Sequence, residues 1–389
     1  MPFDFDQVVS RRGTGSVKWE HYPEDVLPMW VADMDFASPA PVLRALRERA
    51  DHGFFGYTTP APQLKAVVCD RMARLYRWQV TPEQIIFLPS LVSGINVICR
   101  AVGAPGDSVL TLTPTYPPFL SSPGLQQRVC DTVELAHVAH GQTISYGLDW
   151  DALAGAFHER TRLFLLSHPH NPVGLTYDPA TLRRMAELCL RHNTLICSDE
   201  IHCDLLLGAT RHTPMAALAP EIAERTITLM SPSKTFNLPG LGCGLAIVSN
   251  PELRKAIEHA KLGIVPHVNA MGLVAAQAAF AEGETWLTAL RAYLTGNRDF
   301  LVRYVAEHMP GLRTTVPDAT YLAWLDCREA GLTGNPYTFF RDQAKVALSD
   351  GAAFGTGGDG FVRLNFGCPH ALLVEGLERM SAALAQATG

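Results

Sequence analysis

Lys234 lies between small hydroxyl residues in the segment SPSKTFN (residues 231–237), and it is one of six lysines in the chain. A lysine amine, unlike an arginine guanidinium, can attack a carbonyl carbon once its pKa is lowered. The apolar run before it (residues 225–230) predicts a buried strand, so Lys234 would follow a strand's carboxyl end, where open α/β sheets bind ligands. We therefore hypothesise that Lys234 forms a Schiff base with pyridoxal phosphate. The alternative is a surface lysine in a Ser/Pro loop.

That cofactor also needs a carboxylate at its ring nitrogen, donors to its O3′ anion and a cradle for its phosphate. Asp199 ends an apolar run and could pair with the ring nitrogen, although it could equally cap a helix. Asn171 lies between two prolines and could donate to O3′, but Asn-Pro turns are common. His202, three residues after Asp199, could face the same site, yet a lone histidine is usually not a ligand.

Further candidates lie at the ends of other apolar runs. Tyr116 could stack on a ring or be an ordinary core tyrosine. A turn before a predicted helix could offer backbone N–H groups to phosphate, as any strand-to-helix turn could, and two hydroxyls flank the lysine; these residues are Ser90, Leu91, Val92, Ser231 and Ser233. Arg363 lies in the middle of an apolar run, where a guanidinium needs a bidentate anion. A substrate carboxylate would serve, and an internal Asp or Glu is the alternative.

Competing chemistries have weaker support. The chain contains no GxSxG, HExxH or GxxxxGK[ST] segment. His168 and His170 alternate across a proline, which suits a loop better than a metal-binding helix, so no metal site is expected. The glycine cluster at residues 355–360 precedes a predicted strand, whereas a dinucleotide-binding loop would follow one.

Composition limits the classes of partner. The chain has 389 residues, of which 47% are hydrophobic and 18% charged, and its net charge is −6. Without a basic block, neither nucleic acid nor an anionic membrane surface is an expected partner. No apolar stretch reaches the length of a membrane span, and the N-terminus lacks the apolar region of a secretory signal. Nine cysteines without a CxxC pair predict reduced, mostly buried thiols in a cytoplasmic protein.

The elements that must position these residues follow an alternating pattern. Apolar runs with β-branched residues occur at 85–90, 108–114, 163–169, 194–200, 226–231 and 244–249, mostly separated by helical segments. This pattern predicts an α/β fold with a mainly parallel sheet covered on both faces. Helices are expected at 38–52, over 272–308 and at 336–347. We expect an N-terminal arm (1–45) that packs near a small domain (285–389), and a large domain (46–284).

Taken together, these segments resemble a known family. The motifs are RRGTGSVKW, WVADMDF, FGYT, SHPHNPVG, SDEIHCDL, SPSKTFN, YLAWLD and FGTGGDGFVRLNFGCP, which are spread over nearly the whole chain. They are similar to fold-type I enzymes dependent on pyridoxal 5′-phosphate, the aminotransferase class I/II superfamily. Within it they resemble the MalY/PatB-like cystathionine β-lyase branch, the C–S lyases. The resemblance implies a seven-stranded, mainly parallel sheet with helices on both faces and a smaller α+β domain.

The resemblance also implies roles for the candidates. Lys234 would carry the cofactor, Asp199 would pair with its ring nitrogen, and Asn171 with His202 would hold O3′. Tyr116 would stack on the ring, while Ser90, Leu91, Val92, Ser231 and Ser233 would hold the phosphate. Arg363 would bind the substrate's α-carboxylate, and Ala32 and Asp33 would line the substrate pocket. Tyr57 would reach the phosphate of a neighbouring subunit, which implies a homodimer.

The implied reaction is α,β-elimination from cystathionine or another S-substituted L-cysteine, giving a thiol, pyruvate and ammonia. The alternatives are an aminotransferase, a decarboxylative or oxidative variant acting on an amino acid or cysteine conjugate, and a binding protein without turnover. Three departures from the branch pattern are expected at the walls of the site: the turn PSLVSG, Pro239 with Gly240, and His370. They weaken the inference that cystathionine itself is the substrate.

Overall fold

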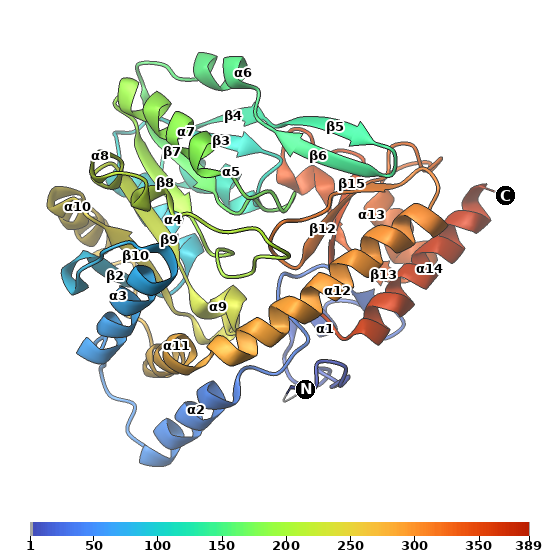
Figure 1. Ribbon diagram of the computed structural model, residues 1–389, viewed down its shortest axis with the longest axis horizontal. Coiled ribbons are helices and arrows are strands. Elements are labelled where there is room, and N and C mark those ends of the chain that lie inside the picture. Colours follow the sequence, from blue (N-terminus) through green and yellow to red (C-terminus); the bar gives the residue numbers. More distant parts are fainter. Residues whose placement is uncertain (1–2, 389) are drawn as a thin grey trace.

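The computed structural model describes residues 3–388 and is built around a seven-stranded sheet (Figure 1). The strand order is β2 (Ile85–Leu88), β10 (Gly244–Val248), β9 (Thr226–Met230), β8 (Leu195–Asp199), β7 (Thr161–Ser167), β3 (Ser108–Thr113) and β4 (Val129–Glu134). Only β10 runs antiparallel to its neighbours. The predicted mainly parallel seven-stranded sheet is therefore confirmed.

Both faces of this sheet are buried, as alternate side chains of β7 show. Leu163 and Leu165 pack in a cluster with α4 (Leu91–Ala101) and α10 (Pro251–Lys261). Phe164 and Leu166 pack in a second cluster with α7 (Pro179–Arg191). Because successive side chains of a strand point to opposite faces, a strand covered on both sides is a continuous apolar run.

A second sheet of six strands forms the core of a smaller unit. Its order is β14 (Ser349–Asp350), β15 (Phe361–Asn365), β12 (Leu322–Asp326), β11 (Arg313–Thr314), β6 (Thr143–Gly147) and β5 (Ala136–His140). The β5–β6 hairpin comes from the middle of the chain, within the range assigned to the large domain. The proposed domain boundaries are otherwise untested and remain a prediction.

The N-terminal arm lies against this smaller unit. Its α1 helix (Val17–Glu20) precedes β1 (Leu27–Pro28), which pairs in parallel with β13 (Val346–Ala347). The arm then leads to α2 (Ala40–His52) and α3 (Pro62–Tyr76), which pack on α11 (Ala270–Glu282). Residues 30–36 thus connect the two units.

The C-terminal half differs from expectation in two helices. The region expected to be helical over 272–308 divides at Gly283 into α11 and α12 (Glu284–His308), and α12 runs beside α14 (His370–Thr388) (Figure 1). The helix expected at 336–347 is shorter: α13 covers Pro336–Phe339, and one π-helical turn follows over Phe340–Ala344. Lys345 then adopts a left-handed conformation, with φ of 57°, and this ends the helix.

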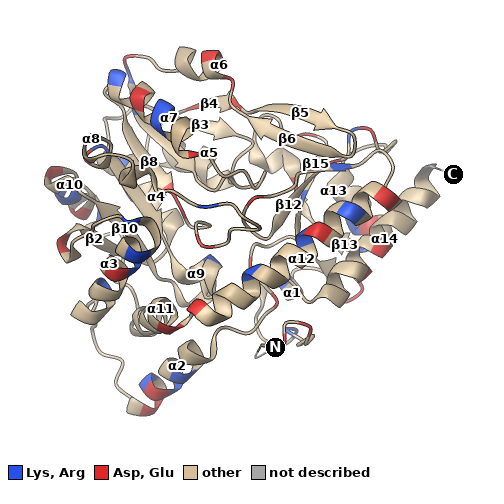
Figure 2. Cartoon of the chain, viewed as in Figure 1, with Lys and Arg blue, Asp and Glu red and all other residues tan. Residues whose placement is uncertain are grey.

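The remaining helices are short: α5 (Pro117–Leu125), α6 (Trp150–Gly155), α8 (Pro220–Ala223) and α9 (Pro232–Thr235). Acidic and basic residues are interspersed along α2, α10 and α12 (Figure 2). All nine cysteines are free, and seven of them are buried. Among residues 3–388, no helix is long and apolar enough to cross a membrane.

Candidate active site

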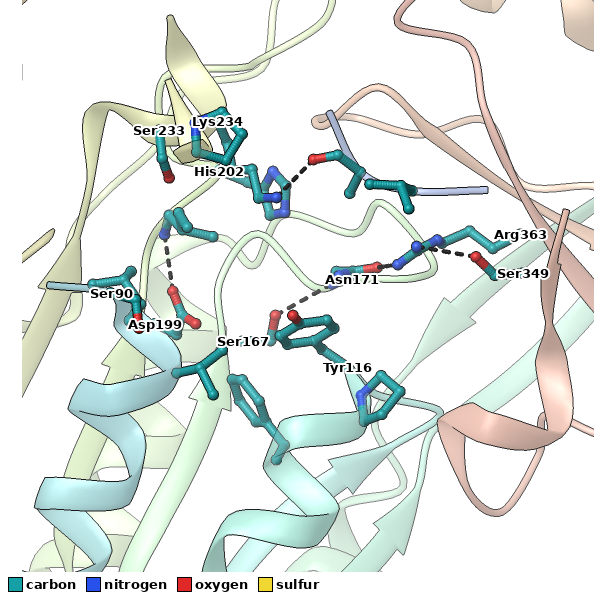
Figure 3. Close-up of a pocket in the computed structure, with 18 of the residues that line it drawn as sticks. Ser90, Tyr116, Ser167, Asn171, Asp199, His202, Ser233, Lys234, Ser349 and Arg363 are labelled. Carbon is teal, nitrogen blue, oxygen red and sulfur yellow. Dashed lines mark hydrogen bonds between the residues drawn. The ribbon is translucent and has the colours of Figure 1, made fainter. Parts of the chain in front are cut away.

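A cavity of about 760 Å³ lies at the carboxyl ends of the parallel strands, between the two units. Figure 3 shows Lys234, Asp199, Asn171, Tyr116 and Arg363 directed toward this space from separate elements. The cavity also reaches the candidates Ala32, Ser90, Leu91, Val92, His202, Ser231 and Ser233. The structure therefore brings together twelve of the fourteen residues that the sequence singled out.

Lys234 lies on the short helix α9, which follows β9 directly. Its Nζ donates a hydrogen bond to the backbone carbonyl of Ala32, at 2.6 Å. Burial and the positive charge of Arg363 lower the pKa of Lys234 to about 8, although the carboxylates of Asp33 and Asp199 oppose this change. At pH 7 about a tenth of the amine is thus unprotonated, far more than for an ordinary lysine, and this free amine can act as a nucleophile or base.

This lowered pKa gives a first prediction. In protein prepared without cofactor, Lys234 can be acylated by a small reagent that reacts with amines. The rate of this acylation should rise with pH along a titration curve with a midpoint near pH 8. Reaction needs the free amine, so the rate rises with pH through the pKa of the group. Mass spectrometry of the peptide that contains Lys234 measures this rate. A midpoint near 10.5, the value of an ordinary lysine, would contradict the described environment.

Asp199 is the last residue of β8 and is only 6% exposed. Its carboxylate accepts one backbone hydrogen bond, from Ile201 N at 3.1 Å, and among residues 3–388 no cationic side chain bonds to it. Burial therefore raises the pKa of Asp199 to about 7. A carboxylate in this position is stabilised by a cationic ligand.

His202 and Asn171 present donors to the same space. Burial, with the positive charges of Lys234 and Arg363, lowers the pKa of His202 to about 3, so its imidazole is neutral. Its buried Nδ1 has no hydrogen-bond partner among the described residues. Asn171 accepts from Arg363 through Oδ1, at 3.1 Å, which orients its Nδ2 group as a donor.

Arg363 is 5% exposed, in the middle of β15. Its guanidinium donates to Asn171 Oδ1, to Trp30 O and to Ser349 Oγ, and it lies 4.9 Å from the centre of the Phe354 ring. No carboxylate of residues 3–388 lies within ion-pair distance, and its buried Nε lacks an acceptor. Burial lowers its pKa to about 10. An internal Asp or Glu partner, the alternative considered from the sequence, is thereby excluded for the described chain.

The turn before α4 has the form of an anion cradle. Ser90 is the N-cap of this helix and accepts from Ser93 N, while the backbone N–H groups of Leu91 and Val92 are at the start of the helix, where no intrahelical acceptor exists. Ser231 caps α9, and its hydroxyl donates to Cys243 O at 2.7 Å. Because that bond uses the only Ser231 hydroxyl proton, the Ser233 hydroxyl, whose Oγ lies 2.9 Å from Ser231 Oγ, is the one that could turn from Ser231 to a phosphate.

Two positions expected in the site, Asp33 and His370, do not line the cavity. Asp33 does not line the cavity, and its carboxylate pairs with Arg11 at 2.8 Å. Tyr57, expected at the phosphate of a neighbouring subunit, is fully exposed and does not line the cavity of its own chain, and its role stays a prediction. His370 was expected at a wall of the site, which is wrong: it begins α14, and its Nδ1 lies 3.0 Å from Asn297 Oδ1. Pro239 does line the cavity, and Tyr116 forms part of its wall before α5.

Some residues of the site escaped the sequence reasoning. Aromatic side chains that were not singled out also line the cavity, among them His21, Tyr22, Trp30, Tyr337 and Phe354. Tyr321 donates its hydroxyl to Ala32 O at 2.8 Å, and Asn365 donates to the carbonyls on either side of that residue. The signal for Asn365 was its position two residues after Arg363, because residues i and i+2 share one face of a strand.

The unsatisfied groups of the cavity fit pyridoxal 5′-phosphate. Its protonated ring nitrogen matches the buried Asp199 carboxylate, and its O3′ anion matches the donors of His202 and Asn171. Its phosphate matches the N-terminus of α4 together with Ser233, and its aldehyde matches the amine of Lys234. Of these groups, the buried His202 Nδ1 has no hydrogen-bond partner among the described residues, and the buried Asp199 carboxylate has no bonded cation there.

Comparison with known proteins agrees with this geometry. Residues 24–380 match the family aminotransferase class I and II. Cystathionine beta-lyase PatB of Bacillus subtilis (strain 168) is 38% identical over 98% of this chain and 100% of its own length. The crystal structure of OvoB is 41% identical with a TM-score of 0.93, covering 98% of this chain and 99% of its own. The C–S lyase of Staphylococcus hominis, solved with bound pyridoxal phosphate, is 30% identical with a TM-score of 0.92, covering 99% of each chain. The chain therefore belongs to the class I and II aminotransferase family, has its fold-type I architecture and uses pyridoxal 5′-phosphate as its cofactor.

Proposed function

We propose that the protein is a pyridoxal phosphate-dependent C–S β-lyase that acts on cystathionine or another S-substituted L-cysteine. One arrangement carries the proposal: a buried guanidinium without an internal carboxylate, Arg363, shares a cavity with the amine of Lys234 and the carboxylate of Asp199. This arrangement suits an α-amino acid. Full-length similarity to a cystathionine β-lyase and to a C–S lyase supports elimination as the outcome.

Separate residues of the chain would bind the substrate carboxylate, the cofactor ring and the cofactor phosphate. Arg363 would bind the α-carboxylate of the substrate through two parallel hydrogen bonds, for which its free Nε is available. Asp199, His202 and Asn171 would hold the cofactor ring, and Tyr116 would cover one face of it. Ser233 and the first turn of α4 would hold the phosphate. Fixed donors and charges of this kind need no rearrangement during the reaction.

The reaction then depends on transfer of the substrate's α-proton to Lys234 Nζ. When bound, the cofactor supplies an electron sink that stabilises negative charge at the α-carbon. Lys234 removes the α-proton, and its lowered pKa makes the free amine available for this. The bond between the β-carbon and sulfur breaks with its electron pair on sulfur. Overall, the S-substituted cysteine and one water give a thiol, pyruvate and ammonium.

An aminotransferase is the second candidate, because the same residues serve every step up to removal of the α-proton and because the family includes aminotransferases. The test is to incubate the cofactor-loaded protein with S-substituted cysteines, with and without an α-keto acid. A lyase releases free thiol continuously without the acceptor. Turnover that requires the acceptor would reject the lyase in favour of the aminotransferase.

The role of Arg363 gives a second prediction. Arg363→Lys keeps the positive charge but loses the planar pair of donors, so KM for an S-substituted L-cysteine should rise about 10- to 100-fold. Steady-state kinetics, with Arg379→Lys at the protein surface as control, measure the change. An unchanged KM would show that the substrate carboxylate binds elsewhere.

We also propose a homodimer in which Tyr57 reaches the phosphate site of the partner. Phe54, Phe55 and Tyr57 are 73%, 60% and 108% exposed on one segment, an apolar surface that a second copy would cover. The third prediction is that light scattering gives a dimer mass, and that Tyr57→Phe weakens cofactor binding about tenfold through loss of one hydrogen bond to a charged group. Tyr304→Phe, whose hydroxyl lies 3.2 Å from Ser381 Oγ in its own chain, is the control. A monomer with full cofactor affinity would refute the shared site.

We also propose that the protein is located in the cytoplasm, because its cysteines are free thiols. Nine free thiols, seven of them buried, suit a reducing compartment. Fractionation of the native cells followed by immunodetection tests this location.

A further inference from the structure

The amine of Lys234 is held by a backbone carbonyl that belongs to a distant segment. Residues 30–36 (WVADMDF), here termed the strap, pass from the smaller unit to the neighbourhood of α9, which carries Lys234. Within the strap, Ala32 O accepts from Lys234 Nζ at 2.6 Å and from Tyr321 OH at 2.8 Å. No other hydrogen bond of the Lys234 amine exists among the described residues. The position of this amine therefore depends on the position of one carbonyl oxygen.

Asn365 determines where that carbonyl points. Its Nδ2 donates to Val31 O and to Asp33 O, each at 2.6 Å, on both sides of Ala32. Its Oδ1 accepts from Gly367 N at 2.8 Å, so all polar atoms of this side chain are bonded. Asn365 is 1% exposed and ends β15, two residues after Arg363. Asp33 N also donates to Val31 O, at 2.9 Å, and the carbonyl of Ala32 points toward Lys234 Nζ and Tyr321 OH.

Several further contacts hold the strap, and Arg11 donates to the Asp33 and Asp35 carboxylates and to Met34 O. Lys18, only 1% exposed, donates to Asp35 Oδ2 at 2.7 Å and to Asp33 O at 3.3 Å. Burial would raise the pKa of Asp35, but the charge and hydrogen bond of Lys18 hold it below its ordinary value. Asn237 accepts from Met34 N and donates to Met34 O. The strap is thus fixed at several points, and among the described side chains only Asn365 binds the backbone carbonyls on both sides of Ala32.

We propose that Asn365 is a positioning residue for Lys234. By binding the carbonyls of Val31 and Asp33, it holds Ala32 O where this oxygen receives the Lys234 amine whenever the amine is not bonded to the cofactor. The amine then occupies one place in the cavity as it takes the α-proton. The inference rests on the proposed role of Lys234 as a base, and it adds a residue that contacts neither substrate nor cofactor.

Asn365 is uncharged, so its replacement changes the pKa of Lys234 only through the position of the amine and its acceptor, and not through a lost charge. The charged groups that face the amine are Arg363, Asp33 and Asp199, and the replacement of Asn365 adds or removes no charge among them. A carbonyl acceptor favours the protonated amine, so loss of the fixed acceptor favours the neutral form. A base that is free to move also reaches the reactive geometry less often, which lowers the rate of proton removal rather than substrate affinity.

The test uses Asn365→Ala with two readouts. Without cofactor, the acylation midpoint of Lys234 should fall by about one pH unit relative to the wild-type protein. With cofactor, exchange of the α-proton of L-alanine with D₂O, followed by NMR, should slow about tenfold or more at unchanged KM. L-alanine has no leaving group, so this exchange does not depend on elimination.

Asn297→Ala is the matched control. Asn297 is 2% exposed, and its Nδ2 also joins two carbonyls, those of Phe366 and Cys368, but it does not touch Val31, Ala32 or Asp33. The proposal requires that Asn297→Ala leave the Lys234 midpoint and the exchange rate as in the wild type. It is overturned if Asn365→Ala changes neither readout, or if both variants change them equally, which would indicate general destabilisation.

Folding and function can be separated in the same experiment. Should Asn365→Ala fail to fold, Asn365→Ser, which keeps a hydroxyl near one carbonyl, is expected to show a smaller change in the same direction. An unaltered midpoint in that variant would reject the proposal. If the wild-type protein does not exchange the α-proton of L-alanine, the proposed function fails, and the acylation midpoints still decide the role of Asn365.

Discussion

Replacing Lys234 by alanine is expected to lower kcat/KM for β-elimination at least about 10³-fold, because the variant loses the only amine in the cavity that can hold the α-proton. The amine lies in a cavity with Asp199, His202 and Arg363, and no other lysine of residues 3–388 lines that cavity. The visible absorbance that arises when the cofactor is bonded to the lysine should also disappear. Steady-state kinetics and absorbance spectra of the cofactor-loaded variant measure both effects.

Lys255→Ala is the control for this result. Lys255 is 73% exposed and pairs with Glu252 on the surface of α10, so its removal should leave both readouts unchanged. A Lys234→Ala protein that keeps the wild-type absorbance would show that the cofactor is bonded elsewhere. The assignment of the central residue would then be wrong.

Asp199→Asn should lower kcat about 10²- to 10³-fold, because the amide keeps the shape of the side chain but loses the charge. Burial raises the pKa of Asp199 to about 7 in the protein alone, so this carboxylate gains most from a cationic partner. A protonated ring nitrogen supplies that partner, and the variant can no longer hold the nitrogen in this form. Stopped-flow measurement of α-proton removal, together with the affinity for the cofactor, reports the loss.

The matched control is Asp151→Asn, which alters an exposed carboxylate in the first turn of α6. It should retain wild-type kinetics. If Asp199→Asn also retained them, the buried carboxylate would have a structural rather than an electronic role. Its position at the end of β8 would then have no bearing on the reaction.

The residues that the sequence identified best are those that directly follow a strand. Lys234 and Asp199 could be placed because apolar runs reveal buried strands, and because the carboxyl ends of parallel strands converge at one edge. Asp33 could not be placed, because its orientation depends on Arg11, a residue 22 positions earlier. His370 could not be placed either, since its partner Asn297 belongs to a distant helix. The orientation of such side chains is determined by tertiary contacts, which local sequence patterns do not reveal.

Strand prediction failed where strands are exposed. Residues 129–134 form the edge strand β4, and residues 136–147 form a hairpin of the smaller sheet, yet neither is an apolar run. Only Val133 is buried in β4, because an edge strand has a solvent-facing side. The seven-stranded sheet was therefore expected from the family resemblance, whereas six of its strands were visible in the sequence.

The most direct test of the proposed function is the stoichiometry of products without an α-keto acid. The cofactor-loaded protein is mixed with an excess of an S-substituted L-cysteine, and thiol, pyruvate and ammonia are measured together against the concentration of active sites. A lyase gives the three products in equal amounts over many turnovers. Formation of about one equivalent of a sulfur-containing keto acid per site, followed by arrest without free thiol, would contradict it and identify an aminotransferase.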